Sequence, residues 1–352
     1  MVFNVDQLSL LFIAFQSFMF SIILFSSHKS KRLSSILLAS FLLVLSLQMT
    51  FLLIYRMRIG FEGLQSFLCV FGFFYGPLLY AYTQSLIFKD FILKPKAFLH
   101  LIPGGIMQFS ALVGFGLCSK GGSLMYISLT FYTVMAIKSI TRYRRIVKQT
   151  QSLVSRINLS WLQWILVVFT VTFLIDIYQH FYSALEIIKG LSLVNLCLLV
   201  LINGMFFRGI QQPIIFQGIS KQDEMIIESD ETSREDNEEK VEIIKSHMNK
   251  ARPFQNSRLT LRDLAEQLQI PPKQLSQIIN KQLDQNFVDF INSYRLNMAT
   301  ERLLKPRDDK ETILEVMYEV GFNSKSSFNT LFKAKTGKTP TEFKKMGVRF
   351  DL

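Results

Sequence analysis

Cysteine is scarce in this sequence of 352 residues, which contains only Cys69, Cys118 and Cys197. Their number is odd, no two of them form a C-x-x-C pair, and each lies in or beside an apolar segment. This pattern is typical of neither a disulfide framework nor a metal site. We therefore expect three small apolar packing residues.

Catalytic motifs are missing as well. The sequence has no H-E-x-x-H, no G-x-S-x-G and no phosphate-binding loop, and its four histidines form no cluster with the cysteines. We therefore expect no enzyme, no bound metal and no cofactor.

Acidic residues are nearly absent from the first part of the chain. Residues 1–208 have 17 Lys+Arg against 5 Asp+Glu, residues 209–252 have 6 against 10, and residues 253–352 have 16 against 12. The formal net charge of +12 therefore arises mainly between apolar segments. An argument for nucleic-acid binding must rest on motifs rather than on net charge.

The first part does contain seven apolar runs, each long enough for a helix across ~30 Å of hydrocarbon. In lipid, every backbone polar group must be paired within its own segment, so the runs should be helices. The runs are Leu8–Phe25, Leu33–Tyr55, Leu64–Phe88, Phe98–Leu117, Ser123–Ile140, Leu159–Tyr182 and Leu191–Phe207. The sequence thus predicts a seven-transmembrane-helix bundle over residues 1–208.

The loops between the runs predict the orientation, because cytoplasmic loops collect Lys and Arg. One set of alternate loops holds 13 of these residues and the other set holds 4. This bias places the N-terminus outside and the C-terminus in the cytoplasm. The first run has no basic residue before it, which is typical of an uncleaved anchor rather than a signal peptide. We expect a multi-pass protein of the bacterial inner (cytoplasmic) membrane.

Two ionisable residues, Asp176 and His180, lie within the sixth run. They are four residues apart and share one helix face, toward the outer end in the predicted topology. One interpretation is a sensor site for a ligand or proton, because ionisable groups within membrane spans are rare and often functional. The alternative is a polar pair that fixes helix packing or meets interfacial water.

Residues 209–245 form an acidic stretch of low hydrophobicity, which favours an extended cytoplasmic linker. A flexible chain of this length spans roughly 30–35 Å. A plain spacer is the simpler interpretation, and an acidic segment that masks a DNA-binding surface is the alternative. A helix over about Lys240–Met248 should lead into a last domain, residues 246–352.

That domain begins with two short amphipathic helices. Thr260 is a candidate cap for a helix over Leu261–Gln269, and a second helix is expected over Lys273–Lys281. The same unit recurs, with helices over Ile313–Val320, capped by Thr312, and over Ser324–Ala334. A long helix over Phe287–Leu304 connects the units. Each unit reads as a helix-turn-helix, so both could enter successive major-groove faces of DNA.

At this point a resemblance becomes specific. The stretch from Gly321 to Lys333, G-F-N-S-K-S-S-F-N-T-L-F-K, and its continuation through Gly337 and Pro340 resemble the signature of AraC/XylS-family transcription regulators. The resemblance extends from Arg252 to Lys345 and implies a seven-helix all-α domain that binds double-stranded DNA through both motifs. More weakly, the first part resembles membrane regions attached to such domains in some bacteria. The predicted fold class is therefore all-α.

Two positions depart from the family pattern. Asp284 stands where glycine is usual after the first recognition helix, and Asp tolerates a left-handed backbone better than most residues. Met317 stands where a small alanine is usual, and its bulk is expected to shift or repack the helices of the second motif.

The residues of the two motifs divide into candidate DNA contacts and structural residues. Amide and hydroxyl side chains and lysines on the exposed faces are candidate base or phosphate contacts. These DNA-binding candidates are Lys273, Gln274, Gln277, Asn280, Lys281, Ser324, Lys325, Ser327, Asn329, Lys333 and Lys335. The expected structural residues are Ala265, Leu275, Ile279, Gly321, Phe322, Phe328, Phe332, Gly337 and Pro340.

The sequence as a whole favours a membrane-anchored one-component transcription regulator. The expected partners are double-stranded DNA, the lipid bilayer and an unknown signal ligand, with a homodimer and the transcription machinery as open possibilities. The alternative is a transporter or channel-like protein with a regulatory DNA-binding tail. Against it, the runs show no doubled six-helix repeat and few charges at depth.

Overall fold

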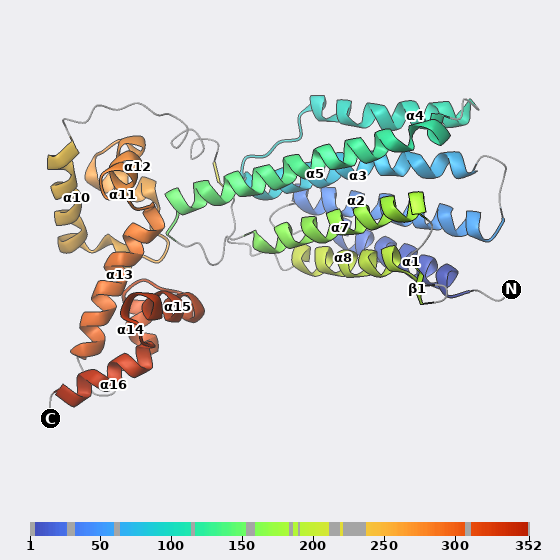
Figure 1. Cartoon of the computed structure of the whole chain (residues 1–352). Coiled ribbons are helices and arrows are strands. Elements are labelled where there is room, and N and C mark those ends of the chain that lie inside the picture. The colour runs from blue at the N-terminus through green and yellow to red at the C-terminus, as the bar shows by residue number, and fades with distance from the viewer. Residues whose placement is uncertain are drawn as a thin grey trace. The chain divides into compact units, whose positions relative to one another are not determined.

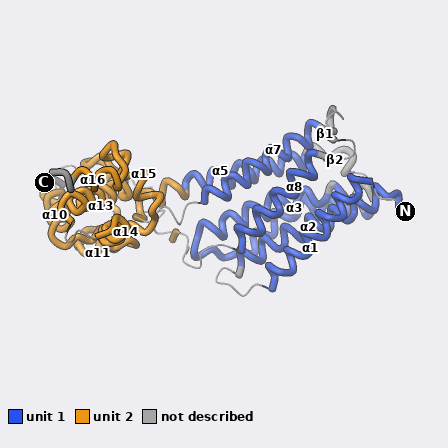
Figure 2. The backbone as a smooth tube through the Cα atoms, turned by 90° about the horizontal axis from the view of Figure 1, so that it is seen from below, with its two compact units in different colours: residues 1–142, 159–218 blue, residues 143–158, 219–352 orange. Residues whose placement is uncertain are grey.

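The computed structural model describes residues 4–26, 32–59, 64–113, 117–152, 159–182, 186–188, 191–210, 219–220, 237–306 and 311–350. These residues are almost wholly helical, apart from a short antiparallel hairpin of β1 (Glu186–Ile188) and β2 (Leu191–Ser192). The chain forms two compact units (Figure 2). Unit 1 contains residues 1–142 and 159–218, and unit 2 contains residues 143–158 and 219–352.

Unit 1 is a helix bundle in which α1 packs on α2, α2 on α3, α3 on α4 and α7 on α8 (Figure 1). Most of its side chains are apolar, so burial on one side of each helix leaves apolar residues on the other. Phe15 is 63% and Trp164 is 69% exposed. The elements are α1 (Val5–Ser26), α2 (Arg32–Arg56), α3 (Leu64–Ile87), the 3-10 helix η1 (Pro95–Leu101), α4 (Ile102–Leu112), α5 (Leu117–Thr150), α7 (Ser160–Tyr182) and α8 (Leu193–Ile210).

Five helices among the described residues are long and apolar enough to cross a membrane. They are Val5–Ser26, Leu33–Arg56, Leu124–Thr150, Ser160–Tyr178 and Leu193–Ile210. The fourth predicted run instead forms η1 followed by α4, a helix of 11 residues that rises only about 16 Å. Residues 114–116 of that run lie outside the described part. The count of seven crossings therefore stays a prediction.

Small and polar side chains bring the bundle helices together. The Ser46 hydroxyl of α2 donates to the carbonyl of Ala14 in α1 at 2.8 Å, and the Gln16 amide of α1 donates to Asn203 of α8 at 2.9 Å. A Cβ at Gly76 of α3 would lie 2.7 Å from the Tyr132 ring of α5. Hydrogen bonds and close approaches of this kind are typical of helix association in membranes.

Unit 2 has one apolar core shared by its helices. The long α13 (Phe287–Leu304) runs between the pair α11 (Leu261–Leu268) and α12 (Pro272–Lys281) and the pair α14 (Ile313–Glu319) and α15 (Lys325–Thr336), as Figure 1 shows. The remaining elements are α10 (Asn237–Ala251), η2 (Pro253–Gln255) and α16 (Pro340–Phe350). The described C-terminal residues thus form seven α-helices.

Two boundaries differ from those expected. The helix α10 starts at Asn237, within the stretch predicted as a linker, and most of the remaining stretch lies outside the described residues. Residues 143–158, which include the end of α5, belong to unit 2 rather than unit 1. Ser152 there donates its backbone N–H to the carbonyl of Leu259 at 3.2 Å.

Candidate nucleic-acid interface

The first motif is formed by α11 and α12. The Thr260 hydroxyl accepts from the backbone N–H of Asp263 at 3.2 Å, and the Asp263 carboxylate accepts from the N–H of Thr260 at 2.9 Å. This capping box fixes the start of α11, so the cap predicted at Thr260 is confirmed. The helix ends at Gln269, which has a φ of 55°. Buried residues of α11 and α12 then share the core of unit 2.

The second motif repeats this construction. Thr312 and Glu315 form the capping box of α14, the turn passes through Gly321 at a φ of 95°, and Ser324 caps α15. The Phe328 ring lies 5.2 Å from the Phe322 ring and 5.5 Å from the Phe332 ring, measured between centroids. This aromatic row packs the turn of the motif against α15.

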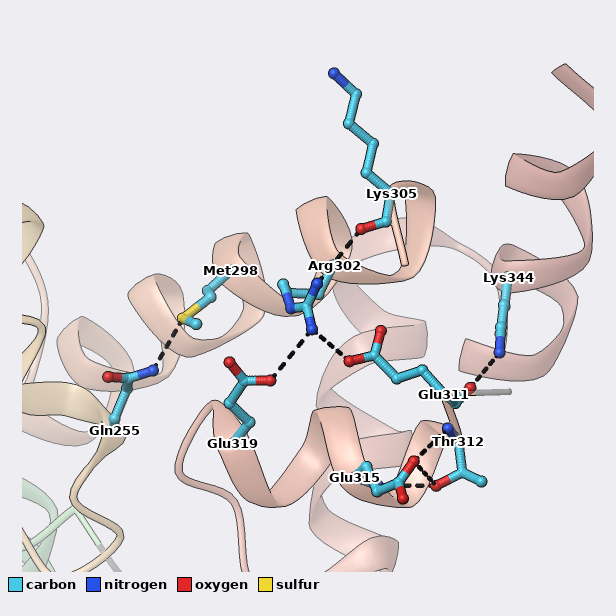
Figure 3. Close-up of polar contacts among 9 residues, drawn as sticks. All are labelled: Gln255, Met298, Arg302, Lys305, Glu311, Thr312, Glu315, Glu319 and Lys344. Atoms are coloured by element: carbon cyan, nitrogen blue, oxygen red, sulfur yellow. Dashed lines mark hydrogen bonds and ion pairs between the residues drawn. The ribbon is translucent and has the colours of Figure 1, made fainter. Parts of the chain in front are cut away.

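Polar contacts attach the second motif to α13 and α16 (Figure 3). Arg302 of α13 pairs with the carboxylates of Glu311 and Glu319, the latter at 3.4 Å. Lys344 of α16 donates to the carbonyl of Glu311. The segment that leads into α14, and the last turn of that helix, are therefore both held by one arginine.

Arg295 of α13 braces the interior of unit 2 and was not singled out as a support from the sequence. It is 2% exposed, and its guanidinium donates to the carbonyls of Phe254 at 2.7 Å and Asn256 at 2.9 Å, and to the Ser152 hydroxyl at 3.3 Å. Burial lowers the pKa of Arg295 to about 10, so the group is still a cation at neutral pH and makes charge-assisted hydrogen bonds.

The outer faces of α12 and α15 carry most of the predicted DNA contacts. On α12, Leu275 and Ile279 face the core, which leaves Lys273, Gln274, Gln277 and Asn280 half-buried and Lys281 exposed. On α15, Phe328 and Phe332 face the core, which leaves Ser327 half-buried and Lys325, Asn329 and Lys333 exposed. Each recognition helix therefore presents amide or hydroxyl groups together with lysines, the groups that contact base edges and phosphates.

Some of the predicted contacts also have partners within the domain. Lys335 donates to the Asn297 side chain and to the carbonyl of Ser293 at 3.4 Å, and desolvation lowers its pKa. Ser324 serves as the cap of α15, and the Asn280 amide donates to the Ser276 hydroxyl at 3.2 Å. The Lys335 ammonium group is thus directed at α13, which counts against its prediction as a phosphate contact.

The residues expected to be structural lie in the core or at turns. Ala265, Leu275, Ile279, Phe322, Phe328, Phe332 and Pro340 are buried, and Gly321 and Gly337 have positive φ. Asp284 has a φ of 50°, so the left-handed backbone expected there is confirmed. Met317 is 1% exposed and belongs to the same apolar core as Val316 and Phe322.

The spacing of the two motifs follows from α13. This helix has 18 residues and is about 27 Å long. Successive major-groove faces on one side of B-DNA lie about 34 Å apart. A separation of this order suits two recognition helices that enter neighbouring turns of the groove.

Comparison with known proteins agrees with this geometry. Residues 264–346 match the family of the helix-turn-helix domain. This part of the chain is an AraC-type helix-turn-helix domain. The uncharacterized HTH-type transcriptional regulator YdeC of Bacillus subtilis (strain 168) is 29% identical over 110 residues, which are 30% of this chain and 37% of that protein. No solved structure gave a significant match.

The matched range of the AraC-type domain begins within α11 and ends within α16, so it includes both motifs. The chain spans about a third of the length of the relative that it matches. The family match therefore lies in the AraC-type domain and does not extend to unit 1.

The two predicted sensor residues lie outside the AraC-type domain, on α7. The Tyr126 hydroxyl of α5 donates to Asp176 Oδ2 at 3.1 Å, a partner that the sequence did not indicate. The side chain of His180 lies outside the described residues, so the pairing of Asp176 with His180 stays a prediction.

Proposed function

We propose that this protein is a membrane-anchored one-component transcription regulator. Its AraC-type domain binds specific double-stranded DNA through α12 and α15, and unit 1 senses the signal that controls this binding. The observation that carries the proposal is the presence, on one chain, of an AraC-type domain and five helices long and apolar enough to cross a membrane.

The composition of unit 2 supports a cytoplasmic position for the DNA-binding domain. Residues 143–158 and 219–352 form one unit, so a membrane cannot separate them. The helices α7 and α8 between these segments therefore cross out and back. Residues 143–158 include the basic residues Arg144, Arg145 and Lys148, which favour the cytoplasmic side. The proposed location is the bacterial inner membrane.

The side chains on the outer faces of α12 and α15 suggest which DNA contacts each helix makes. Gln274, Gln277 and Asn329 can each form paired hydrogen bonds with adenine, and Lys325 near the start of α15 can reach a guanine edge. Lys281 and Lys333 lie later on their helices and suit phosphates. A homodimer on paired sites and contact with the transcription machinery belong to the same proposal.

The test is genome-wide crosslinking of the tagged full-length protein, with a blot of the membrane fraction from the same cells. We expect sharp DNA peaks while the intact chain stays in the membrane. Asn329→Ala should lower binding to the best site by about 1–3 kcal/mol and relax preference at one base position, whereas Lys333→Ala should weaken all sites and lower the salt dependence.

Gln267→Ala is the matched control, because this exposed amide lies on α11 and is not a predicted contact. It should leave the peaks unchanged. Absence of peaks for a folded full-length protein would contradict the proposal. Peaks that persist after removal of residues 1–142, which keeps residues 143–158 of unit 2, with an unchanged response to growth conditions, would refute the sensing role of this part of unit 1.

A further inference from the structure

Unit 1 contains a cavity of about 270 Å³, to which the proposed function assigns no role. Its lining comes from α1, α2, α3, α5, α7 and α8. Ligand sites for drug-sized molecules usually measure about 300–1,000 Å³. This cavity therefore suits a smaller molecule.

Among the described residues, three charged side chains line the cavity: Asp6 of α1, Arg56 of α2 and Asp176 of α7. They are two carboxylates and one guanidinium. Among the residues that the structure describes, the Arg56 guanidinium has no carboxylate within ion-pair distance, although two carboxylates share its cavity. A ligand with both a cationic and an anionic group can contact the carboxylates and the guanidinium at once.

Hydrogen bonds orient the carboxylates. The Asn195 amide of α8 donates to Asp6 Oδ1 at 3.2 Å and to the Ser9 hydroxyl at 2.8 Å. The Tyr126 hydroxyl donates to Asp176 Oδ2 at 3.1 Å. A third polar pair, Tyr75 and Gln48, also lines the cavity. These bonds fix the directions of both carboxylates.

The rest of the lining is apolar apart from Thr172. The buried side chains among these residues are Leu10, Leu45, Met49, Leu129 and Phe169. An apolar wall beside a few oriented polar groups is the usual composition of a small-molecule site. The ligand should therefore have an apolar body and a charged head.

Two of the charged groups lie at helix ends of unit 1. Asp6 is the second residue of α1 and Arg56 is the last of α2. Tyr126 precedes Arg142, the last residue of α5 in unit 1, by 16 residues, which is about 24 Å along a helix. In the proposed topology this end is the outer one, so the cavity is accessible from outside the cell.

From these observations we infer that the cavity binds a small apolar α-amino acid. Its ammonium group would pair with Asp176 and Asp6, its carboxylate with Arg56, and its side chain would contact the apolar wall. The inference deepens the proposed function and rests on it, because it names the class of signal that unit 1 senses.

The test measures binding to the purified full-length protein in lipid nanodiscs by calorimetry. Three probes of the same shape separate the contributions: L-leucine, 3-methylbutylamine without the carboxylate, and 4-methylpentanoate without the amine. We expect leucine to bind best, the amine more weakly, and the acid not at all. Equal binding of the acid and the amine, or no binding of leucine at millimolar concentration, would overturn the inference.

Variants test which charged side chain of the cavity pairs with which charged group of the ligand. Asp176→Asn should weaken leucine and the amine by at least about 30-fold, as loss of one partner in a charged pair does. Arg56→Gln should weaken leucine but not the amine, which has no carboxylate. The matched controls Asp90→Asn and Lys89→Gln, exposed residues after α3 that do not line the cavity, should change neither.

Should Asp176→Asn fail to fold, Tyr126→Phe removes only one hydrogen bond to the carboxylate and should weaken leucine about fivefold. Wild-type affinity in this variant would argue against the site. Crosslinking to DNA in the same variants keeps the two proposals apart. Sharp DNA peaks without leucine binding would refute the ligand class alone, whereas leucine binding without peaks would refute the regulator.

Discussion

At the turn of the second motif, Gly321 has a φ of 95°, and a Cβ at this position would lie 2.4 Å from the carbonyl oxygen of Phe254. It would also lie 3.0 Å from Nε of Arg295, which donates to that same carbonyl. Glycine is required here for two reasons: the backbone conformation and the space that the carbonyl and the guanidinium occupy.

We expect Gly321→Ala to lower the free energy of unfolding of unit 2 by more than about 2 kcal/mol. Gly337→Ala is the matched control: its φ is 74°, but a Cβ there has nothing within 4 Å, so the cost should be about 1 kcal/mol. Hydrogen exchange of α14 and α15 in the full-length protein measures both. Equal losses of unfolding free energy in the two variants would show that the Phe254 carbonyl moves aside to make room for a Cβ at position 321.

Residues differ in how far the sequence predicts their roles. The caps at Thr260 and Thr312 follow from rules that act over three residues, and both are confirmed. Arg295 could not be assigned in this way. Its partners Phe254, Asn256 and Ser152 lie 41, 39 and 143 residues away, and nothing local marks an arginine as buried.

Among the elements, α11 to α15 were predicted to within two residues, whereas α10 extends three residues beyond the predicted Lys240–Met248 at each end. Their amphipathic stripes and caps are local, and α13 has the expected bounds. The prediction was wrong for the extent of α5, whose apolar run ends at Ile140 whereas the helix continues to Thr150. Arg and Lys end an apolar run but are good helix formers, so hydropathy alone underestimates such a helix.

Two helices of unit 2 have a glutamate in the first turn that accepts a hydrogen bond from a backbone N–H. The N–H of Thr312 donates to Glu315 at 2.7 Å, and the N–H of Thr339 donates to Glu342 at 2.8 Å. These bonds lower the pKa of both carboxyl groups from the usual 4.5. A carboxyl group whose pKa is lower in the folded state than in the unfolded state stabilises the fold above pH 4.5. This stabilisation is lost as the pH falls through the pKa of the folded state.

We therefore expect the stability of unit 2 to decrease below about pH 4.5, and the double variant Glu315→Gln with Glu342→Gln to have a shallower decrease. Glutamine keeps the acceptor oxygen but does not titrate. Unfolding followed by circular dichroism between neutral and acidic pH measures the slope. Glu301→Gln, an exposed position within α13, is the control, and an equal slope in the double variant would contradict the assignment.

For the molecule as a whole, the sequence predicted a membrane part followed by a DNA-binding part, but not that residues 143–158 belong to the second unit. Composition describes where a segment is apolar or charged. It does not report that Gln151 pairs with Thr260 or that Ser152 reaches Leu259 and Arg295, since these contacts join segments more than a hundred residues apart.

We expect Ser152→Ala to lower the free energy of unfolding of unit 2 by about 1 kcal/mol, the usual worth of one hydrogen bond. Faster hydrogen exchange in residues 253–260 of the full-length protein would report the loss. Ser246→Ala, at an exposed position of α10, is the control. No change at Ser152→Ala would show that the hydroxyl adds nothing to the bonds of Arg295 with the carbonyls.

The division of unit 2 into two segments also sets an order of biogenesis. The ribosome makes residues 143–158 first, then α7 and α8, and only afterwards residues 219–352. The hydrogen bond between Arg295 and Ser152 therefore cannot form until both intervening apolar helices have been made and, on the proposed topology, inserted. A nascent chain stalled in insertion would lack a complete DNA-binding unit, so the cell would gain an active regulator only from molecules whose membrane part is already assembled.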